Sequence, residues 1–346
     1  MACVKDGESY DAEQFMNRGN TPMVPKLTVI TTGGTIATPT DKGEKRLTAT
    51  DFARDLSDSP KWADVTWKDF LNVPSSSLSP ENVLQLTHLA EEEIQGGADG
   101  VVITHGTDVL EETAYLLSLF WTHTQPVILT GAMRSAGSAG ADGPRNLTAA
   151  IVAAGSRKSL GRGPLVVLND EIHAASQVTK MHSWAVDTFT SEYGPVGIIN
   201  QWNEVHYHRR TENRETLPRP SSLNEPVALI TAGMGMDETM VDALIAGGFR
   251  AMVIEAAGLG SLPPAMQRGL ERTALRAIAV VASRCTFGGT VAGRSSKGII
   301  RAGSLSGIKA RLKLMVGMSL YGEDREAIGN LFRQQSWKGE PDDRER

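Results

Sequence analysis

The chain has 346 residues, of which 40% are hydrophobic and 22% are charged, as in a globular protein of about two domains. Its formal net charge of −5 argues against nucleic-acid binding, which usually requires a basic surface. The two cysteines, Cys3 and Cys285, exclude a disulfide framework and a zinc site built on several cysteines. No motif surrounds Cys285, which is therefore predicted to be a core residue.

The N-terminal segment 1–26 is predicted to be a flexible extension. Residues 1–19 are polar and acidic, and they lack the apolar core of a signal peptide. No apolar run in the sequence approaches the ~20 residues that cross a bilayer. We therefore expect a cytoplasmic protein that makes no membrane contact, with Met1 or Met23 as its natural start.

Apolar runs and amphipathic helical patterns alternate through the first part of the chain. Helices are predicted from Pro80, over residues 110–121 and from Pro144. Strands are predicted at residues 27–30, 101–104, 127–130 and 165–168. Alternation with continuously apolar strands predicts an α/β fold with a doubly wound, mostly parallel sheet. Ligands of such sheets bind beyond the carboxyl ends of the strands.

A polar segment with two prolines, residues 209–225, is predicted to be a linker. Strands are then predicted at residues 227–231, 252–254 and 278–281, with helices near 238–246, 265–274 and 308–316 and a last helix near the C-terminus. These patterns predict a larger N-terminal α/β domain over 27–208, a smaller C-terminal parallel α/β domain over 226–337 and a charged tail, 338–346. Three basic residues of the 308–316 helix, Lys309, Arg311 and Lys313, are predicted to form a solvated face.

The segment Thr31-Thr32-Gly33-Gly34-Thr35 directly follows the first predicted strand. Two glycines allow a sharp turn and the close approach of a ligand, and the Thr35 hydroxyl would project at the strand end. The other interpretation is a connecting loop. A phosphate cradle is disfavoured because both G-x-G-x-x-G and the Walker lysine pattern are absent.

The segment Thr104-His105-Gly106-Thr107-Asp108 also follows a strand. One hypothesis makes Asp108 the cap of the next helix, with Glu111 completing a capping box. The other pairs Asp108 with Thr107 in the crevice, where the carboxylate would hold a substrate ammonium group. His105 is consistent with either a packed structural residue or a base.

Lys180 matters for chemistry only if it is buried near Thr107. A neutral lysine amine there could accept the proton of a hydroxyl, help that a weakly nucleophilic threonine needs. Another candidate site is a pair of imidazoles, His206 and His208, which could lie on one strand face as metal ligands.

Five blocks, in this order, resemble the bacterial-type L-asparaginase family from about residue 27 to about residue 332. Each block alone has modest specificity, whereas the ordered set is highly specific. The blocks are Thr32-Gly33-Gly34-Thr35-Ile36-Ala37, Ser75-Ser76-Ser77-Leu78-Ser79-Pro80-Glu81, His105-Gly106-Thr107-Asp108 with Leu110-Glu111-Glu112-Thr113-Ala114, Gly131-Ala132-Met133-Arg134 with Ala141-Asp142-Gly143-Pro144, and Val178-Thr179-Lys180.

The resemblance implies a hydrolase acting on linear amides, which converts L-asparagine to L-aspartate and ammonia and has minor activity on glutamine. It implies no metal and no organic cofactor, and a homo-oligomer, dimer or tetramer, as the assembled form. Two alternatives remain open: an amidase for a different small amide, and a non-catalytic amino-acid sensor on the same fold.

The resemblance also implies roles for individual residues. Thr35 would be the nucleophile that forms an acyl-enzyme, and Thr107, Lys180 and Asp108 would form a relay that activates the nucleophile or the hydrolytic water. The substrate-binding residues implied are Ser75, Ser76, Gly34, Gly106 and Asp108.

Departures from the family pattern bear on turnover, affinity and the identity of the amide. Residues 38–46 lack the tyrosine that many relatives carry in a closing lid, and Ser76 stands where many high-affinity members have glutamine. Residues 290–297 lack the acidic residue that some members donate to a neighbouring subunit, and residues 258–261 end without the usual asparagine.

Overall fold

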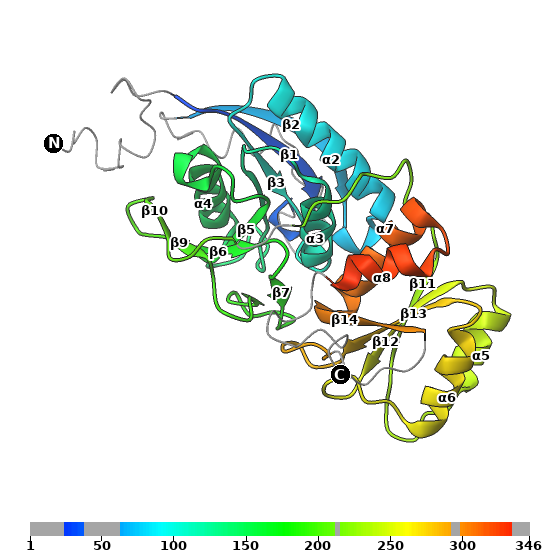
Figure 1. Cartoon of the computed structure of the whole chain (residues 1–346). Helices are drawn as coiled ribbons and strands as arrows, with labels where there is room; N and C mark the ends of the chain where they lie inside the picture. Colours follow the sequence, from blue (N-terminus) through cyan, green and yellow to red (C-terminus); the bar gives the residue numbers. More distant parts are fainter. Residues whose placement is uncertain (1–23, 38–62, 212–214, 292–297, 334–346) are drawn as a thin grey trace. The chain divides into compact units, whose positions relative to one another are not determined.

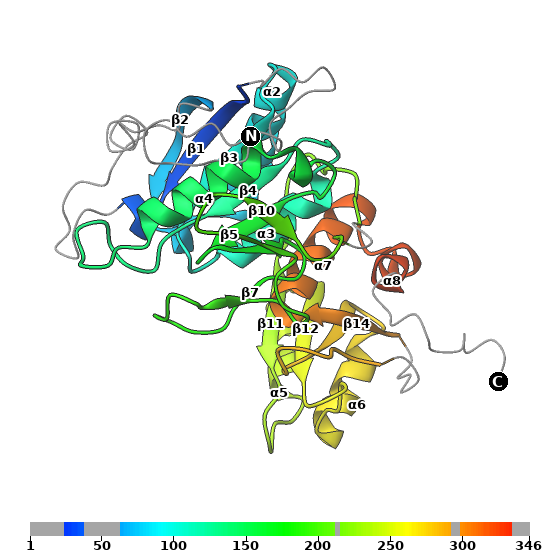
Figure 2. The ribbon, with the colours of Figure 1, turned by 90° about the vertical axis from the view of Figure 1, so that its left-hand side faces the viewer.

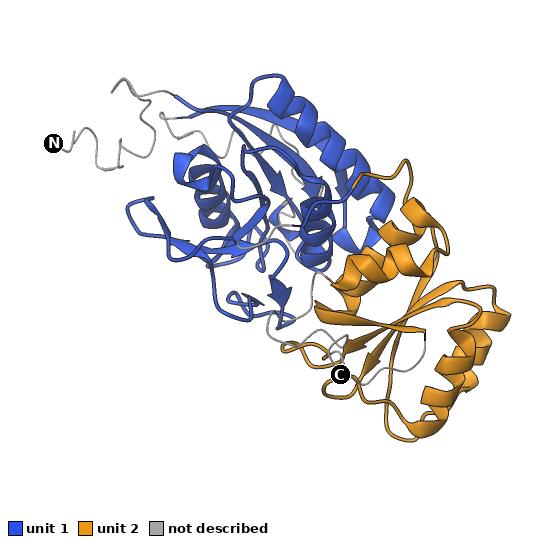
Figure 3. Ribbon diagram, viewed as in Figure 1, with its two compact units in different colours: residues 1–217 blue, residues 218–346 orange. Residues whose placement is uncertain are grey.

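The computed structural model describes residues 24–37, 63–211, 215–291 and 298–333. The chain divides into two compact units, residues 1–217 and 218–346 (Figure 3). Each unit has its own sheet and its own hydrophobic core. No helix in the described ranges is long and apolar enough to cross a membrane.

In the described part of unit 1, the main sheet has eight strands in the order β10-β9-β6-β5-β4-β3-β1-β2. The first five strands along the chain are parallel, and the last three are antiparallel additions at one edge. The strands are β1 (Lys26–Gly33), β2 (Asp64–Val73), β3 (Gly100–Thr104), β4 (Val127–Thr130), β5 (Leu165–Leu168), β6 (Glu171–Ala174), β9 (Gly197–Ile199) and β10 (Val205–Tyr207).

Helices cover both faces of this sheet (Figures 1 and 2). The helix α4 (Gly143–Gly155) packs on the face that carries Leu27 and Val29. The opposite face carries Thr28, whose hydroxyl donates a 3.0 Å hydrogen bond to Glu93 of α2 (Pro80–Gln95). α3 (Leu110–Phe120) packs beside α2. This arrangement confirms the doubly wound α/β fold.

Local sequence explains where α2 begins. Ser79 is the N-cap and accepts a hydrogen bond from the Asn82 amide, while the Asn82 side chain accepts one from the Ser79 amide. Pro80 occupies the first helical position, where its missing N–H costs nothing. The helix therefore starts directly after the 3-10 turn η3 (Ser75–Ser77), which fixes the position of Ser75 relative to the sheet.

Unit 2 contains a parallel sheet in the order β11-β12-β13-β14 among its described residues. Helices α5 and α6 bury one face of the sheet in a core that includes Met252, Ile254 and Met266, whereas α7 packs against the sheet and against α8. The elements are β11 (Val227–Thr231), α5 (Thr239–Ala246), β12 (Ala251–Ala256), α6 (Pro264–Thr273), β13 (Ile278–Ser283), β14 (Ile299–Ser306), α7 (Gly307–Tyr321) and α8 (Arg325–Arg333).

The solvated face predicted for the 308–316 helix is wrong. Lys309 and Lys313 of α7 are 4% and 0% exposed, because α7 is covered by the sheet and by α8. The Lys313 ammonium lies 5.4 Å from the centre of the Phe332 ring, and the Arg311 guanidinium donates a 2.9 Å bond to the Val227 carbonyl. The buried position predicted for Cys285 is also wrong, since this thiol is exposed in the bend that follows β13.

Candidate active site

Three sequence blocks meet at one edge of the unit 1 sheet. Thr35 follows β1, Ser75 follows β2 and Thr107 follows β3. β1 pairs in parallel with both β2 and β3, so the carboxyl ends of all three strands lie side by side. In open α/β sheets this edge is where ligands bind.

Two glycines hold these segments in close contact. A Cβ on Gly34 would lie 2.4 Å from the Gly106 Cα, and the Gly34 φ of 89° is in the left-handed region. A Cβ on Gly106 would lie 2.8 Å from the Ser75 Oγ. Only glycine fits either position, because any side chain would overlap backbone or a buried serine. The predicted binding residues Gly34, Gly106 and Ser75 therefore form one contact cluster.

The Lys180 ammonium joins Thr107 and Asp108. Its Nζ donates hydrogen bonds to Thr107 Oγ1 at 3.0 Å and to Asp108 Oδ1 at 2.9 Å. The Lys180 side chain is 13% exposed, whereas that of Asp108 is 72% exposed and faces solvent. The structure thus assembles a hydroxyl, an amine and a carboxylate from two parts of the chain.

Lys180 lies on a two-stranded sheet that is separate from the eight-stranded sheet. β7 (Thr179–Lys180) pairs antiparallel with β8 (Phe189–Thr190). The Lys180 backbone N–H donates to Glu111 Oε2 at 3.2 Å, which ties this hairpin to the first turn of α3. The hairpin therefore positions Lys180 through both its backbone and its side chain.

The capping box predicted for Asp108 and Glu111 is wrong. The helix α3 begins at Leu110, and its N-cap is Val109 without a side-chain cap. Asp108 lies one residue before the cap position. Its carboxylate accepts from the Lys180 side chain, and the Glu111 carboxylate accepts from the Lys180 backbone.

His105 is a structural residue. It is fully buried, and its Nδ1 lies 2.6 Å from the Gly106 carbonyl oxygen, which can only accept a hydrogen bond. Nδ1 therefore carries the proton, and Nε2 accepts from the Thr113 hydroxyl at 3.0 Å. Burial lowers the pKa of His105 to about 4, so the ring is neutral at pH 7 and holds the loop after β3 against α3.

The backbone around Thr35 is fixed on both sides. Thr32 Oγ1 donates to the Thr104 carbonyl at 2.9 Å and joins the ends of β1 and β3. After Thr35, Ile36 is 3% exposed and packs against Gly143, where a Cβ would lie 3.1 Å from Ile36 Cγ1. Thr35 itself is partly exposed at the start of η2 (Thr35–Ala37). Its hydroxyl is therefore presented from a rigid turn.

The fourth sequence block forms a clamp behind Thr107. Asp142 accepts hydrogen bonds from the backbone N–H groups of Met133 and Arg134, both at 2.9 Å. Asn146 donates to the Gly131 carbonyl at 3.0 Å. A Cβ on Gly131 would lie 3.2 Å from Thr107 Cγ2, so the clamped loop packs directly on Thr107.

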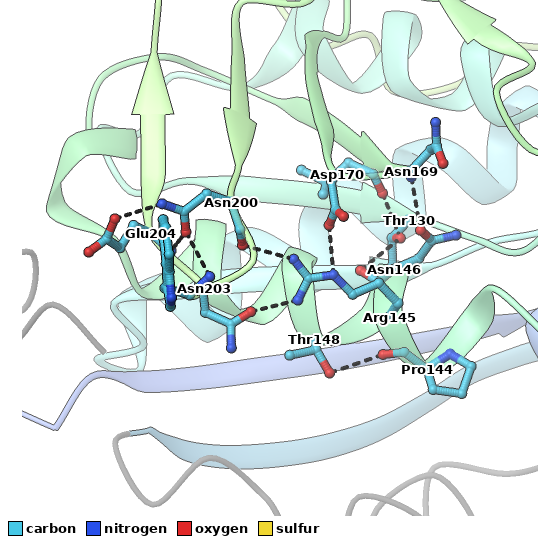
Figure 4. A network of polar contacts seen from close by, with 12 residues as sticks. Thr130, Pro144, Arg145, Asn146, Thr148, Asn169, Asp170, Asn200, Asn203 and Glu204 are labelled. Atoms are coloured by element: carbon cyan, nitrogen blue, oxygen red, sulfur yellow. Dashed lines mark hydrogen bonds and ion pairs between the residues drawn. The ribbon is translucent and has the colours of Figure 1, made fainter. Parts of the chain in front are cut away.

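The neighbouring Arg145 was not singled out from the sequence, where nothing but its position after Pro144 marks it. Its guanidinium donates to Asp170 Oδ1 at 2.7 Å, to Asn203 Oδ1 at 2.6 Å and to the Asn200 carbonyl at 3.1 Å (Figure 4). Asp170 and Asn203 have positive φ values of 61° each. Arg145 therefore fixes the two strained turns beside the start of α4.

The other candidate positions contribute less. Ser76 is exposed, and residues 38–46 and 292–297 lie outside the described residues. His206 Nε2 lies near the side chains of Asn200 and Glu204, at 3.2 and 3.3 Å. Among the described residues, no group of three or more His, Cys, Asp or Glu side chains could hold a metal ion.

A hydroxyl, an amine and a carboxylate at the carboxyl edge of a parallel sheet are the groups of an amide hydrolase. Comparison with known families agrees. The family described as Asparaginase, N-terminal matches residues 26–213, and the Glutaminase/Asparaginase C-terminal domain matches residues 226–332. The chain belongs to the asparaginase family, as the five sequence blocks predicted.

Individual relatives span most of the chain. A probable L-asparaginase of Deinococcus radiodurans is 38% identical over 90% of this chain and 98% of its own length. A glutaminase-asparaginase of Pseudomonas fluorescens is 32% identical over 76% of both chains. The crystal structure of a probable cytoplasmic L-asparaginase from Campylobacter jejuni, 29% identical, superposes with a TM-score of 0.81 over 89% of this chain and 99% of that one.

Proposed function

We propose that this protein is an L-asparaginase that hydrolyses L-asparagine to L-aspartate and ammonia, with lower activity on glutamine. The observation that carries the proposal is the Lys180 ammonium bonded to both Thr107 and Asp108, beside the contact of Gly34 with Gly106. A crevice that only bound an amino acid would have no need of a lysine directed at a threonine hydroxyl.

In the proposed first step, Thr35 Oγ attacks the side-chain amide carbon of the substrate and forms a tetrahedral intermediate. Thr107 Oγ1 accepts the hydroxyl proton and passes its own proton to the amide nitrogen, the Lys180 ammonium stabilises the charge that develops on Thr107, and ammonia departs as the C–N bond breaks. Backbone N–H groups near Thr107 help to stabilise the oxyanion. The product of this step is an ester between Thr35 and the β-carboxyl of aspartate.

In the second step, Thr107 Oγ1 accepts a proton from water as its oxygen attacks the ester carbonyl, and passes its own proton to Thr35 Oγ1, while the Lys180 ammonium stabilises the charge that develops on Thr107. The C–O bond to Thr35 breaks, the threonine recovers its proton, and aspartate is released. Asp108 holds Lys180 through Oδ1, and its second carboxylate oxygen is available to the substrate ammonium group. Ser75 binds the substrate α-carboxylate.

The test is the release of ammonia from L-asparagine, and separately from L-glutamine, by the purified protein. We expect release from asparagine, and at least a thousandfold loss, to order of magnitude, in both Thr35→Ala and Thr107→Ala. Thr124→Ala, at an exposed threonine outside the site, is the matched control and should retain activity.

Other outcomes would redirect the assignment. Ammonia release from a third amide alone would make the protein an amidase with a different substrate. Binding of asparagine without turnover would make it an amino-acid sensor. Equal activity of Thr35→Ala and the parent protein would contradict the role of Thr35.

We propose in addition that the protein is a cytoplasmic homo-oligomer, a dimer or a tetramer, that needs no cofactor. Sedimentation equilibrium of the full chain should give two or four times the monomer mass of 37.1 kDa. A monomer with full activity would contradict the assembly, and recovery of the native protein outside the cytoplasmic fraction would contradict the location.

A further inference from the structure

A pocket lies in unit 1, at the edge of the sheet formed by β9 and β10. Its volume is about 690 Å³, and its walls come from these two strands and from the segment around the 3-10 turn η4 (Arg157–Ser159). The lining residues are Lys158, Arg162, Ile198, Asn200, Val205, His206, Tyr207 and His208.

This pocket is remote from the candidate active site within the sheet. Thr35 and Thr107 follow β1 and β3, whereas the pocket lies on β9 and β10. Three strands, β6, β5 and β4, separate β9 from β3 in the sheet order. A ligand here would not touch the residues assigned to hydrolysis.

The charge of the lining is positive. Lys158 and Arg162 are cations, and no carboxylate is among the described residues that line the pocket. Glu204 lies just outside the lining, where Asn200 and His206 engage its Oε2 and the charge of Lys158 attracts its carboxylate. The walls therefore favour an anion over a cation or a neutral ligand.

Arg162 is held in place before any ligand arrives. Its Nε donates to the Lys158 carbonyl at 2.7 Å, and its NH1 donates to the Arg209 carbonyl at 3.0 Å. The guanidinium lies 3.6 Å from the centre of the Tyr207 ring. A preorganised cation loses little further entropy when it binds an anion.

The hydroxyl of Tyr207 is hydrogen-bonded and uncharged. Its hydroxyl lies 2.7 Å from Ser159 Oγ, and burial raises the pKa of Tyr207 to about 12. The phenol therefore cannot cancel the positive charge of Arg162 at neutral pH. Lys158 Nζ donates one bond, to the Val205 carbonyl at 3.2 Å, and an ammonium group has three donors.

We propose that this pocket binds a small dianion through Lys158 and Arg162. The two positive charges match two oxyanion charges, and the Nη2 group of Arg162, beside the engaged Nε and Nη1, can donate to phosphate and carboxylate alike. Ile198, which is 36% exposed, adds an apolar wall for a short carbon skeleton. The ligand is thus a phosphate compound or a dicarboxylate.

The test is isothermal titration calorimetry of the full-length protein with inorganic phosphate and, separately, with succinate, against sodium chloride at matched ionic strength. Lys158→Gln removes one pocket charge. Arg157→Gln removes an equal charge from the neighbouring exposed residue, which does not line the pocket. Far-UV circular dichroism would check that both variants fold.

We expect Lys158→Gln to weaken dianion binding about tenfold or more, and Arg157→Gln to change it less than about twofold. Binding of inorganic phosphate alone would identify a phosphate ligand, and binding of succinate alone a dicarboxylate. Heats no larger than those of sodium chloride would overturn the proposal. Equal weakening in both variants would overturn it as well, because general charge screening would then explain the binding. Neither readout depends on asparagine hydrolysis.

Discussion

Lys180 Nζ and Thr107 Oγ1 are joined by a 3.0 Å hydrogen bond although 73 residues separate them along the chain. The threonine follows a strand of the main sheet, and the lysine comes from the β7–β8 hairpin. The fold therefore brings a positive charge to a hydroxyl that would be only weakly reactive alone.

Replacement of Lys180 tests this relationship. Lys180→Met should lower kcat for asparagine by roughly 10²- to 10⁴-fold with a smaller change in KM, because the positive charge that supports proton transfer through Thr107 is lost while the binding residues remain. Steady-state ammonia release would measure both constants. Lys180→Arg keeps the charge, so it should retain more activity than Lys180→Met. A Lys180→Arg variant as inactive as Lys180→Met would contradict this electrostatic role.

The contact between Gly34 and Gly106 predicts a large effect of one methyl group. Gly34→Ala should destabilise unit 1 by about 2–5 kcal/mol, which combines the strain of a positive φ with overlap on Gly106. Gly97→Ala is the matched control, since its φ is 100° but no atom lies within 4 Å of the added Cβ. It should cost only about 1–2 kcal/mol. Urea denaturation would measure both, and equal costs would show that the contact is looser than described.

The buried imidazole of His105 predicts a pH dependence of stability. Its pKa is lowered to about 4 by burial, from the ordinary 6.5. Between these values the unfolded chain binds a proton that the folded protein does not, so stability is lost as the pH falls below 6.5. The slope is about 1.4 kcal/mol per pH unit for this group.

Urea denaturation at a series of pH values from about 7.5 to about 4.5 would measure this slope. His105→Gln should reduce it by one proton equivalent. His88→Gln removes a histidine whose side chain is 62% exposed and should leave the slope unchanged. An unchanged slope in His105→Gln would contradict the assigned neutral state.

Two serines of the turn η3 should differ in their effect on substrate binding. Ser75 is 4% exposed and lies against Gly106, whereas Ser77 of the same turn is exposed. Loss of a hydrogen bond to a charged group predicts that Ser75→Ala raises KM for asparagine about tenfold or more. Ser77→Ala should leave KM within about twofold. Similar KM values for the two variants would remove Ser75 from the binding site.

Metal removal provides a further check. Activity after dialysis against EDTA should equal that of the untreated protein, because the proposed steps use only hydroxyl, amine and carboxylate groups. Added magnesium or zinc should not raise it. Loss of activity that zinc restores would require a different mechanism.

The central strands and the site could be predicted because their signals are local. β3 is continuously apolar and buried, and the Gly34 and Gly106 loops directly follow their strands. Strand β2 was missed because it is an edge strand with alternating exposure, so charged residues such as Lys68 interrupt its pattern.

Long-range contacts account for the incorrect predictions. Asp108 satisfies the local capping pattern, yet its carboxylate accepts a hydrogen bond from Lys180, which is distant in sequence. The basic pattern of α7 indicates a solvated face, yet Lys313 is covered by a helix that follows it. The clamp of Asp142 and Asn146 likewise depends on loops that only the folded sheet brings together. The spacing of residues along the chain therefore does not predict these contact partners.

The hairpin that supplies Lys180 is paired at only two residue positions on each strand and stands apart from the eight-stranded sheet. An element of this size opens at a lower free-energy cost than a central strand. We therefore expect heat to inactivate the enzyme before the main sheet unfolds. On warming, ammonia release should fall before the far-UV signal of the sheet does, and the loss should reverse on cooling.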